Sequence, residues 1–235
     1  MAVQGTILGV WAHPDDEAYL SAGVMAMAVH AGSRVACVTA TRGEQGSPDE
    51  QLWPTATLAD VREAELEASL GILGVDEHEW LGYPDGGCAE VPPAGAVERI
   101  ADAIRRVEPD TVLTFGPDGM TGHPDHRTVS AWTTRAFAQA ASPGARLLYA
   151  TKTAAWADRF SQVVEPLGVF DGSGPPCTPE AELAIALRLD QPYLDLKLAA
   201  LRAQASQVMG LSEAMGDVTY RDWVADEWFR LGATG

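Results

Sequence analysis

Residues 6–31 read TILGVWAHPDDEAYLSAGVMAMAVHA and place a strand pattern, a polar turn and a helix pattern in direct succession. The run Thr6–Ala12 is short and apolar, which predicts a buried strand. Glu17–Ala31 carries apolar residues at helical spacing and ends at Gly32, which predicts a helix. The polar segment HPDD (residues 13–16) lies where the chain leaves the strand.

The same alternation continues along the chain. Further strands are predicted at Arg34–Thr39, Thr111–Phe115, Arg146–Thr151 and Glu182–Leu189, and helices at Leu58–Leu73, Pro93–Val107, Arg127–Ala141 and Tyr193–Gln207. This order predicts an α/β fold, a doubly wound, mostly parallel sheet with helices on both faces. We expect a single domain over residues 1–235, in which the part from about residue 172 forms a less regular extension on the substrate side.

Composition excludes several classes of protein. The 33 acidic and 16 basic residues give a net charge of −17, which disfavours binding to nucleic acid or to anionic lipid. No apolar run approaches the ~18 residues of a membrane span, and a basic, signal-like N-terminus is lacking. The three cysteines are far apart in the sequence, so neither a disulfide framework nor a thiolate metal site is expected, and a cytoplasmic location fits.

A second polar motif, GHPDH at residues 122–126, follows the predicted strand Thr111–Phe115 just as the first motif follows Thr6–Ala12. Three of the five histidines fall in these two segments, whereas His30 and His78 are interpreted as non-catalytic. Either motif alone could simply begin a helix with a capping aspartate. Two such motifs at strand carboxyl ends, where doubly wound sheets bind ligands, favour one shared site.

The residue types in the two motifs suit a metal. A catalytic zinc takes three imidazole or carboxylate ligands and leaves one position for water, and His13, Asp16 and His126 would supply that set. Asp15 and Asp16 are adjacent in a tight turn, so one can bind the metal while the other faces the water. His123 and His126 lie three residues apart on one helix face, so one can bind the metal while its neighbour points at the substrate.

The pair AHPDDE (residues 12–17) and GHPDH (residues 122–126) resembles the LmbE-like, or PIG-L-type, deacetylase family. Its members include N-acetylglucosaminyl-phosphatidylinositol deacetylase and the deacetylases of mycothiol and bacillithiol biosynthesis. The similarity runs from about residue 7 to residue 207. It implies a Rossmann-like fold and a zinc-dependent amidohydrolase, with Fe²⁺ as an alternative metal, that removes an N-acyl group, expected to be acetyl, from a small amino sugar or its conjugate.

The resemblance also implies roles for single residues. It matches the zinc site to His13, Asp16 and His126. Asp15 would be the general base, and His123 would polarise or protonate the scissile amide. Asp125 would steady the His123 imidazole.

Two further positions carry weaker predictions. Arg62 sits where the sugar deacetylases have a substrate-contacting arginine, although it could equally be a surface residue paired with Glu65 or Glu67. Asp85 lies in a loop that resembles one contacting sugar hydroxyls, although a plain Pro-Asp-Gly turn explains it as well.

Departures from the family pattern leave alternatives open. Gln204 replaces a usual histidine, and Thr121 replaces a tyrosine of the mycothiol-type enzymes, whose chains are also longer, so a mycothiol-type substrate is not predicted. The substrate could be another amide, such as a thiol conjugate or an acylated antibiotic sugar. A non-catalytic nucleotide- or sugar-binding domain is disfavoured because no GxGxxG follows the first strand. The aromatic tail, Leu211–Leu231, is expected to pack back on the body as core or to form the dimer interface of a homo-oligomer, although Trp223 and Trp228 could also line a sugar cleft.

Overall fold

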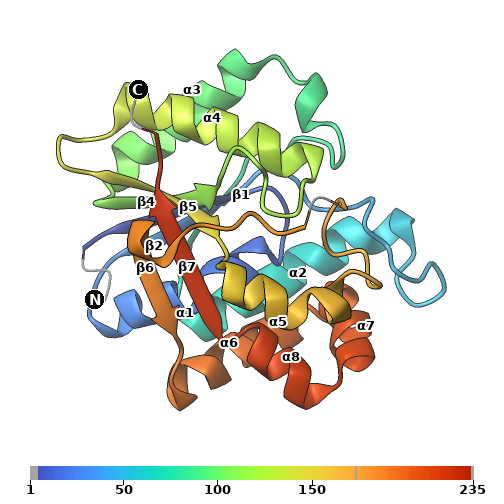
Figure 1. The fold of residues 1–235 in the computed structure, drawn as a ribbon. Coiled ribbons are helices and arrows are strands. Elements are labelled where there is room, and N and C mark those ends of the chain that lie inside the picture. Colours follow the sequence, from blue (N-terminus) through green and yellow to red (C-terminus); the bar gives the residue numbers. More distant parts are fainter. Residues whose placement is uncertain (1–4, 173, 234–235) are drawn as a thin grey trace.

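The computed structural model describes residues 5–172 and 174–233. Its strands form one seven-stranded sheet in the order β3-β2-β1-β4-β5-β7-β6 (Figure 1). They are β1 (Ile7–Trp11), β2 (Val35–Thr39), β3 (Glu77–Trp80), β4 (Thr111–Phe115), β5 (Arg146–Thr151), β6 (Leu183–Arg188) and β7 (Asp226–Leu231). The helices are α1 (Asp16–His30), α2 (Thr55–Leu73), α3 (Pro93–Val107), α4 (Pro124–Ala140), α5 (Ala154–Val164), α6 (Gln191–Ala203), α7 (Ala205–Met215) and α8 (Asp217–Trp223), with short 3₁₀ helices at Cys88–Glu90 and Glu180–Glu182.

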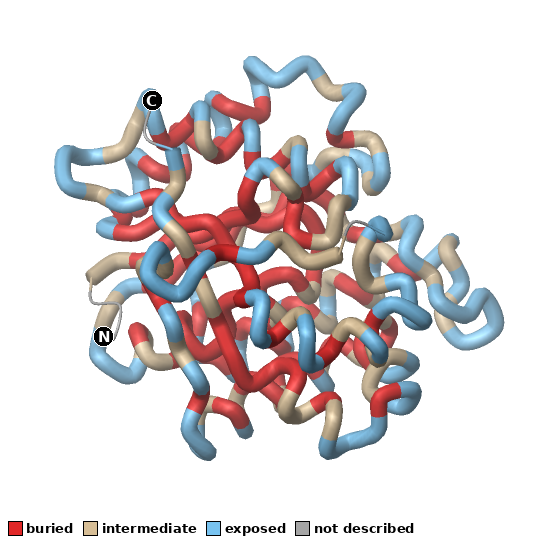
Figure 2. Tube along the Cα trace, viewed as in Figure 1, coloured by how far each residue is buried: buried red, intermediate tan, exposed pale blue. Residues whose placement is uncertain are grey.

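The predicted α/β architecture is confirmed. Strands β1 to β5 pair in parallel, and β7 pairs antiparallel with both β5 and β6. Helices α3 and α4 pack together on one face of the sheet, while α1, α2 and α6 cover the other (Figure 1). The sheet therefore lies between two helical layers, and buried residues concentrate in its central strands (Figure 2).

The strand order of the sheet changes direction between β1 and β4, which are themselves parallel. From β1 the chain moves outward to β2 and β3 and then crosses back to β4, on the other side of β1. The β1–β4 pairing ends at Gly9 and Leu113, although β1 continues to Trp11 and β4 to Phe115. The two strands part at their carboxyl ends, which is where doubly wound folds form a crevice. The first polar motif follows β1 directly, and the second follows β4 after residues 116–121.

Other segments differ from the prediction. The segment around His78 is not a simple connection but the edge strand β3, whose sequence EHEW has no apolar alternation because its side chains are only partly covered. The helix predicted over Tyr193–Gln207 is interrupted at Gln204, where α6 gives way to α7. The aromatic tail does pack back on the body, since it supplies α8 and β7. The division of the chain into one domain with a C-terminal extension stays a prediction.

A buried ion pair ties three of these elements together. The ammonium of Lys197 on α6 lies 2.8 Å from Glu227 on β7, and both side chains are fully buried. Glu227 also accepts hydrogen bonds from the backbone N–H groups of Gly23 and Val24 in α1, both at 2.8 Å. Lys197 donates to the carbonyl of Tyr19, also at 2.8 Å. The pair thus satisfies backbone groups within α1, one turn beyond the first motif.

Replacing Lys197 with methionine should lower the free energy of unfolding by about 3–5 kcal/mol, because Glu227 would remain as a buried charge without its partner. The double variant Lys197→Met/Glu227→Gln should recover part of this loss, since the buried amide carries no charge. Urea denaturation measures both effects. As a control, Arg105→Met removes an exposed ion pair with Glu98 and should leave stability unchanged. Equal stability of Lys197→Met and the parent would contradict the role given to this pair.

Candidate active site

The first motif forms a strained turn at the start of α1. Asp15 has a φ of 94°, a conformation that is unfavourable for a residue with a side chain. The turn is held because the backbone N–H of Asp15 donates to Glu17 at 3.0 Å, and that of His13 donates to Asp16 at 2.8 Å. The two adjacent carboxylates therefore face different neighbours. Asp15 lies toward Arg62, and Asp16 lies toward His126.

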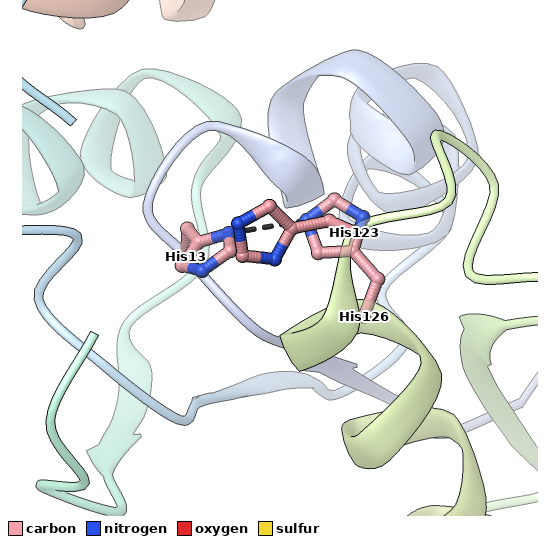
Figure 3. Close-up of side chains that lie close together, drawn as sticks. All are labelled: His13, His123 and His126. Carbon is pink, nitrogen blue, oxygen red and sulfur yellow. Dashed lines mark hydrogen bonds between the residues drawn. The ribbon is translucent and has the colours of Figure 1, made fainter. Parts of the chain in front are cut away.

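Three imidazoles from the two motifs converge at the parting ends of β1 and β4. Nδ1 of His13 lies 3.1 Å from Nε2 of His126, the contact dashed in Figure 3. The His123 ring lies 4.8 Å from the ring of His13 and 5.1 Å from that of His126. His123 is the most exposed of the three. The structure thus brings together segments that are more than one hundred residues apart in the sequence.

The buried rings of His13 and His126 each have one inner nitrogen, which faces the other ring, and one outer nitrogen, which faces a hydrogen-bond acceptor. Nδ1 of His126 lies 3.0 Å from the carbonyl oxygen of Gly119. Nε2 of His13 lies 3.1 Å from Asp85 and 3.3 Å from Asp125. These acceptors assign the ring protons to the outer nitrogens. The inner nitrogens, which face each other, are left with their lone pairs.

This arrangement fits a divalent metal ion. Two imidazole lone pairs directed at each other repel unless a cation or a proton lies between them, and metal-binding histidines commonly donate their other N–H to a carboxylate or carbonyl. Asp16 adds a carboxylate, 3.4 Å from Nε2 of His126 and 3.8 Å from Nδ1 of His13. His123 completes a cluster in which three imidazole nitrogens lie within 4.8 Å of one another. The donors are those that zinc and ferrous iron accept.

The electrostatics of the site agree with this fit. Burial lowers the pKa of His13, but hydrogen bonds to Asp125 and Asp85 outweigh burial and raise that pKa to about 10. For His126, burial and the charge on His13 hold the pKa well below its usual value. The carboxylates therefore stabilise one positive charge beside His126. A bound metal ion would take the place of that proton.

The structure places Asp125 differently from the expectation. Its fully buried carboxylate accepts hydrogen bonds from the backbone of Gly86 at 2.7 Å and of Cys88 at 3.0 Å, and it contacts His13. The His123 ring accepts only the backbone N–H of Asp125, at 3.1 Å. Asp125 therefore steadies His13 rather than His123, because the carboxylate points away from its own motif, into the loop after β3.

Arg62 lies inside the protein. It is 4% exposed, donates to the carbonyl of Gly43 at 2.8 Å and lies 3.5 Å from the carboxylate of Asp15. The alternative of a surface pair with Glu65 or Glu67 is therefore wrong. Burial raises the pKa of Asp15 to about 7, although the charge of Arg62 opposes that rise.

A cavity of about 320 Å³ opens beside the cluster. One wall is polar and contains Asp15, Asp16, Arg62, Asp85 and the three histidines. The rest of the lining is largely apolar and includes Tyr19, Phe115, Met120, Phe170, Leu211 and Trp223. Asp85 thus lies at the site, where its carboxylate accepts the backbone N–H of Gln45 at 2.8 Å and contacts His13.

The sequence did not assign a role to Glu17 or to Gln204. Glu17 is fully buried, and it accepts a hydrogen bond of 2.6 Å from the side-chain amide of Gln204 and one of 3.3 Å from Ser69. Burial, followed by the charge of Asp15, raises the pKa of Glu17 to about 8. Because Glu17 also holds the backbone of Asp15, Gln204 acts through Glu17 to fix the strained turn. The only sequence signal was the departure from the family's histidine.

The fold and the site together define a metal-dependent N-deacetylase, a hydrolase that cleaves amides. Residues 8–137 match the PIG-L family, described as GlcNAc-PI de-N-acetylase. The chain belongs to this family, which confirms the resemblance drawn from the two motifs.

Individual relatives agree. The chain is 33% identical over 251 residues to 1D-myo-inositol 2-acetamido-2-deoxy-alpha-D-glucopyranoside deacetylase of Kineococcus radiotolerans, covering 86% of this chain and 68% of the relative. It is 32% identical over 274 residues to the enzyme of the same name from Thermobifida fusca, covering 96% and 92%. The structure of N,N'-diacetylchitobiose deacetylase from Pyrococcus horikoshii has a TM-score of 0.67 at 22% identity, covering 97% and 83%, and this likeness concerns the fold. None of the helices that the structure describes could cross a membrane.

Replacing Gln204 with leucine should lower the free energy of unfolding by about 1–3 kcal/mol, because the buried Glu17 carboxyl would lose a hydrogen-bond donor. It should also lower kcat, since the turn that carries Asp15 would loosen. Gln204→His restores a donor and should retain more of both. Denaturant titration and kinetics measure the two effects. The control is Gln191→Leu on the exposed face of α6, and identical behaviour of Gln204→Leu and this control would refute the positioning role.

Proposed function

We propose that the chain is a zinc-dependent deacetylase of sugars or glycoconjugates that contain N-acetylglucosamine. The observation that carries this proposal is the pair of inner imidazole nitrogens of His13 and His126, 3.1 Å apart, beside the carboxylate of Asp16. This donor set borders a cavity large enough for a small ligand, and a second carboxylate, Asp15, lines the same cavity.

His13, Asp16 and His126 would hold the ion. When bound, zinc would acidify a water molecule to a pKa of about 7 and withdraw electrons from a carbonyl group. The acceptors of the outer nitrogens, Gly119 for His126 and Asp85 and Asp125 for His13, keep both rings oriented with their lone pairs inward. Ferrous iron accepts the same ligands and is the alternative metal.

Asp15 moves the proton. Its carboxylate is set apart from Asp16 by the strained turn, and its pKa of about 7, raised by burial, lets it hold a proton near neutral pH. It takes a proton from the water that attacks the amide carbon. The same oxygen then delivers this proton to the nitrogen of the leaving amine, so that the C–N bond breaks to give a free amine and acetate.

His123 stabilises the oxygen of the scissile amide. Because its Nδ1 accepts the backbone N–H of Asp125, the ring proton is on Nε2. Burial and the charge of His13 lower the pKa of His123, so the ring is a neutral donor. A neutral N–H directed at an oxygen that gains negative charge lowers the barrier to attack.

The substrate proposal is supported by the curated relatives, both named for an inositol glycoside of 2-acetamido-2-deoxyglucose, a mycothiol-type substrate. Gln204 and Thr121, two of the departures that argued against a mycothiol-type substrate, both contact residues of the site. Gln204 bonds Glu17, and Thr121 lies 3.2 Å from Nδ1 of His126. Neither departure therefore removes a necessary group. Arg62 and Asp85, both on the cavity wall, are the proposed contacts for sugar hydroxyls.

The zinc-loaded protein should release a primary amine from 1D-myo-inositol 2-acetamido-2-deoxy-alpha-D-glucopyranoside. Removing the metal with dipicolinate should abolish the activity, and adding zinc should restore it, since the imidazole lone pairs would regain their cation. Amine release, followed with fluorescamine, measures this. N-acetylglucosamine and N,N'-diacetylchitobiose serve as comparison substrates. The proposal fails if the metal-loaded protein releases amine from none of the three.

The adjacent aspartates should behave differently. Asp15→Asn should retain the metal but lose at least ~10²-fold in kcat, because an amide cannot accept the proton. Asp16→Ala should lose metal and activity together, and excess zinc should rescue part of this loss but none of the Asp15 loss. Metal analysis by mass spectrometry and kinetics separate the two. Asp102→Asn, on the exposed face of α3, is the control. Normal turnover by metal-loaded Asp15→Asn would assign the base elsewhere.

A further inference from the structure

The chain has only two lysines, and both are buried. Lys197 is neutralised by Glu227, as described above. Lys152 follows the last residue of β5, is 8% exposed and lines the same cavity as the imidazole cluster. Its backbone is held on both sides, because its N–H donates to Pro176 and its carbonyl accepts from Thr178. The backbone of Lys152 is therefore fixed in the wall of the proposed active site.

The ammonium of Lys152 lies against aromatic rings. Its Nζ is 4.5 Å from the centre of the Trp156 ring and 5.4 Å from that of Trp228. Such faces stabilise a cation but accept none of its three hydrogen bonds in the ordinary sense. Over residues 5–172 and 174–233, no carboxylate or other acceptor lies within bonding distance of this Nζ. The ammonium is thus left with unused donors.

The two carboxylates whose negative charge acts on Lys152, Glu227 and Asp226, already have other partners. Asp226 pairs with Arg188 at 2.7 Å, and Glu227 pairs with Lys197. Burial, followed by the positive charge of Lys197, lowers the pKa of Lys152 to about 7. An anion entering the cavity would supply the partner that the protein does not.

The arginine side chain that lines the cavity already has partners. Arg62 is occupied by the carbonyl of Gly43 and lies beside Asp15. Lys152, in contrast, borders an aromatic cluster, since the Trp156 ring lies 6.3 Å from Phe170 and 6.2 Å from Trp223, which both line the cavity. An anion bound to Lys152 would therefore lie near Phe170 and Trp223.

We propose that Lys152 forms an anion-binding subsite, and that the preferred substrate carries a carboxylate or phosphate group in addition to its N-acyl group. This inference rests on the proposed deacetylase function, and it favours an anionic N-acetylglucosamine conjugate over the neutral inositol glycoside for which the relatives are named. The ammonium of Lys152 would donate charge-assisted hydrogen bonds to the anionic oxygens of the substrate. The apolar part of the substrate next to these oxygens would contact Phe170 and Trp223. Because the chain has a net charge of −17, a positive charge on Lys152 would offset the repulsion that an anionic ligand meets in the cavity.

The test compares neutral N-acetylglucosamine with N-acetylglucosamine 1-phosphate and N-acetylmuramic acid, which carry a phosphate and a carboxylate. The parent should show a KM at least ~10-fold lower for an anionic substrate, as expected for a charge-assisted hydrogen bond. Lys152→Met, which is close to lysine in shape, should raise this KM at least tenfold more than that of the neutral sugar. Lys152→Arg should keep part of the preference. A preference for only one of the anions would identify phosphate or carboxylate as the ligand.

The matched control is Arg159→Met, which removes an exposed cation from the neighbouring helix α5 and should leave the preference intact. Calorimetric binding of the products glucosamine and glucosamine 1-phosphate gives a readout that does not depend on turnover. If amine is released but neutral and anionic substrates share one KM, and the products one affinity, the subsite is refuted and the deacetylase function stands. If no sugar is hydrolysed but glucosamine 1-phosphate binds through Lys152, only the deacetylase function is refuted.

Discussion

The short pairing of β1 with β4 is the constraint on which the site depends. Hydrogen bonding between these strands stops at Gly9 and Leu113, and the edge-to-face contact of Trp11 with Phe115, with ring centres 5.2 Å apart, fills the gap beyond. The Phe115 ring in turn stacks on His126 at 4.2 Å. The separation of two strands thus sets both the position of the crevice and the orientation of one imidazole within it.

Three consecutive acidic residues, 15 to 17, are held largely out of water at this point, which would be unfavourable without compensation. Each has its own partners: Arg62 for Asp15, the imidazoles of His13 and His126 for Asp16, and Gln204 for Glu17. These partners come from four separate segments of the chain, around residues 13, 62, 126 and 204. Burial raises the pKa of Asp15 and of Glu17, and because the carboxyl groups share one turn, the charge of a neighbouring aspartate raises each pKa further.

Much of this could be predicted from the sequence, for physical reasons. Strand and helix periodicity revealed the parallel sheet, and topology then placed the two histidine motifs together. Strand β3 escaped notice because an exposed edge strand needs no apolar alternation, and the helix break at Gln204 because that side chain turns inward to Glu17. The contacts of Asp125, Gln204 and Lys152 depend on packing between distant segments, which local periodicity does not encode.

The hydrogen bonds between Glu227 and α1 affect the order in which the folded structure can form during synthesis. During synthesis the first motif leaves the ribosome early, yet two backbone N–H groups of α1 behind it donate to a glutamate that is made about two hundred residues later. Gln204, which fixes the turn itself, also arrives late. Contacts of such long range form slowly. The contacts that hold the first motif are therefore complete only after β7, the last strand that the structure describes, has been made.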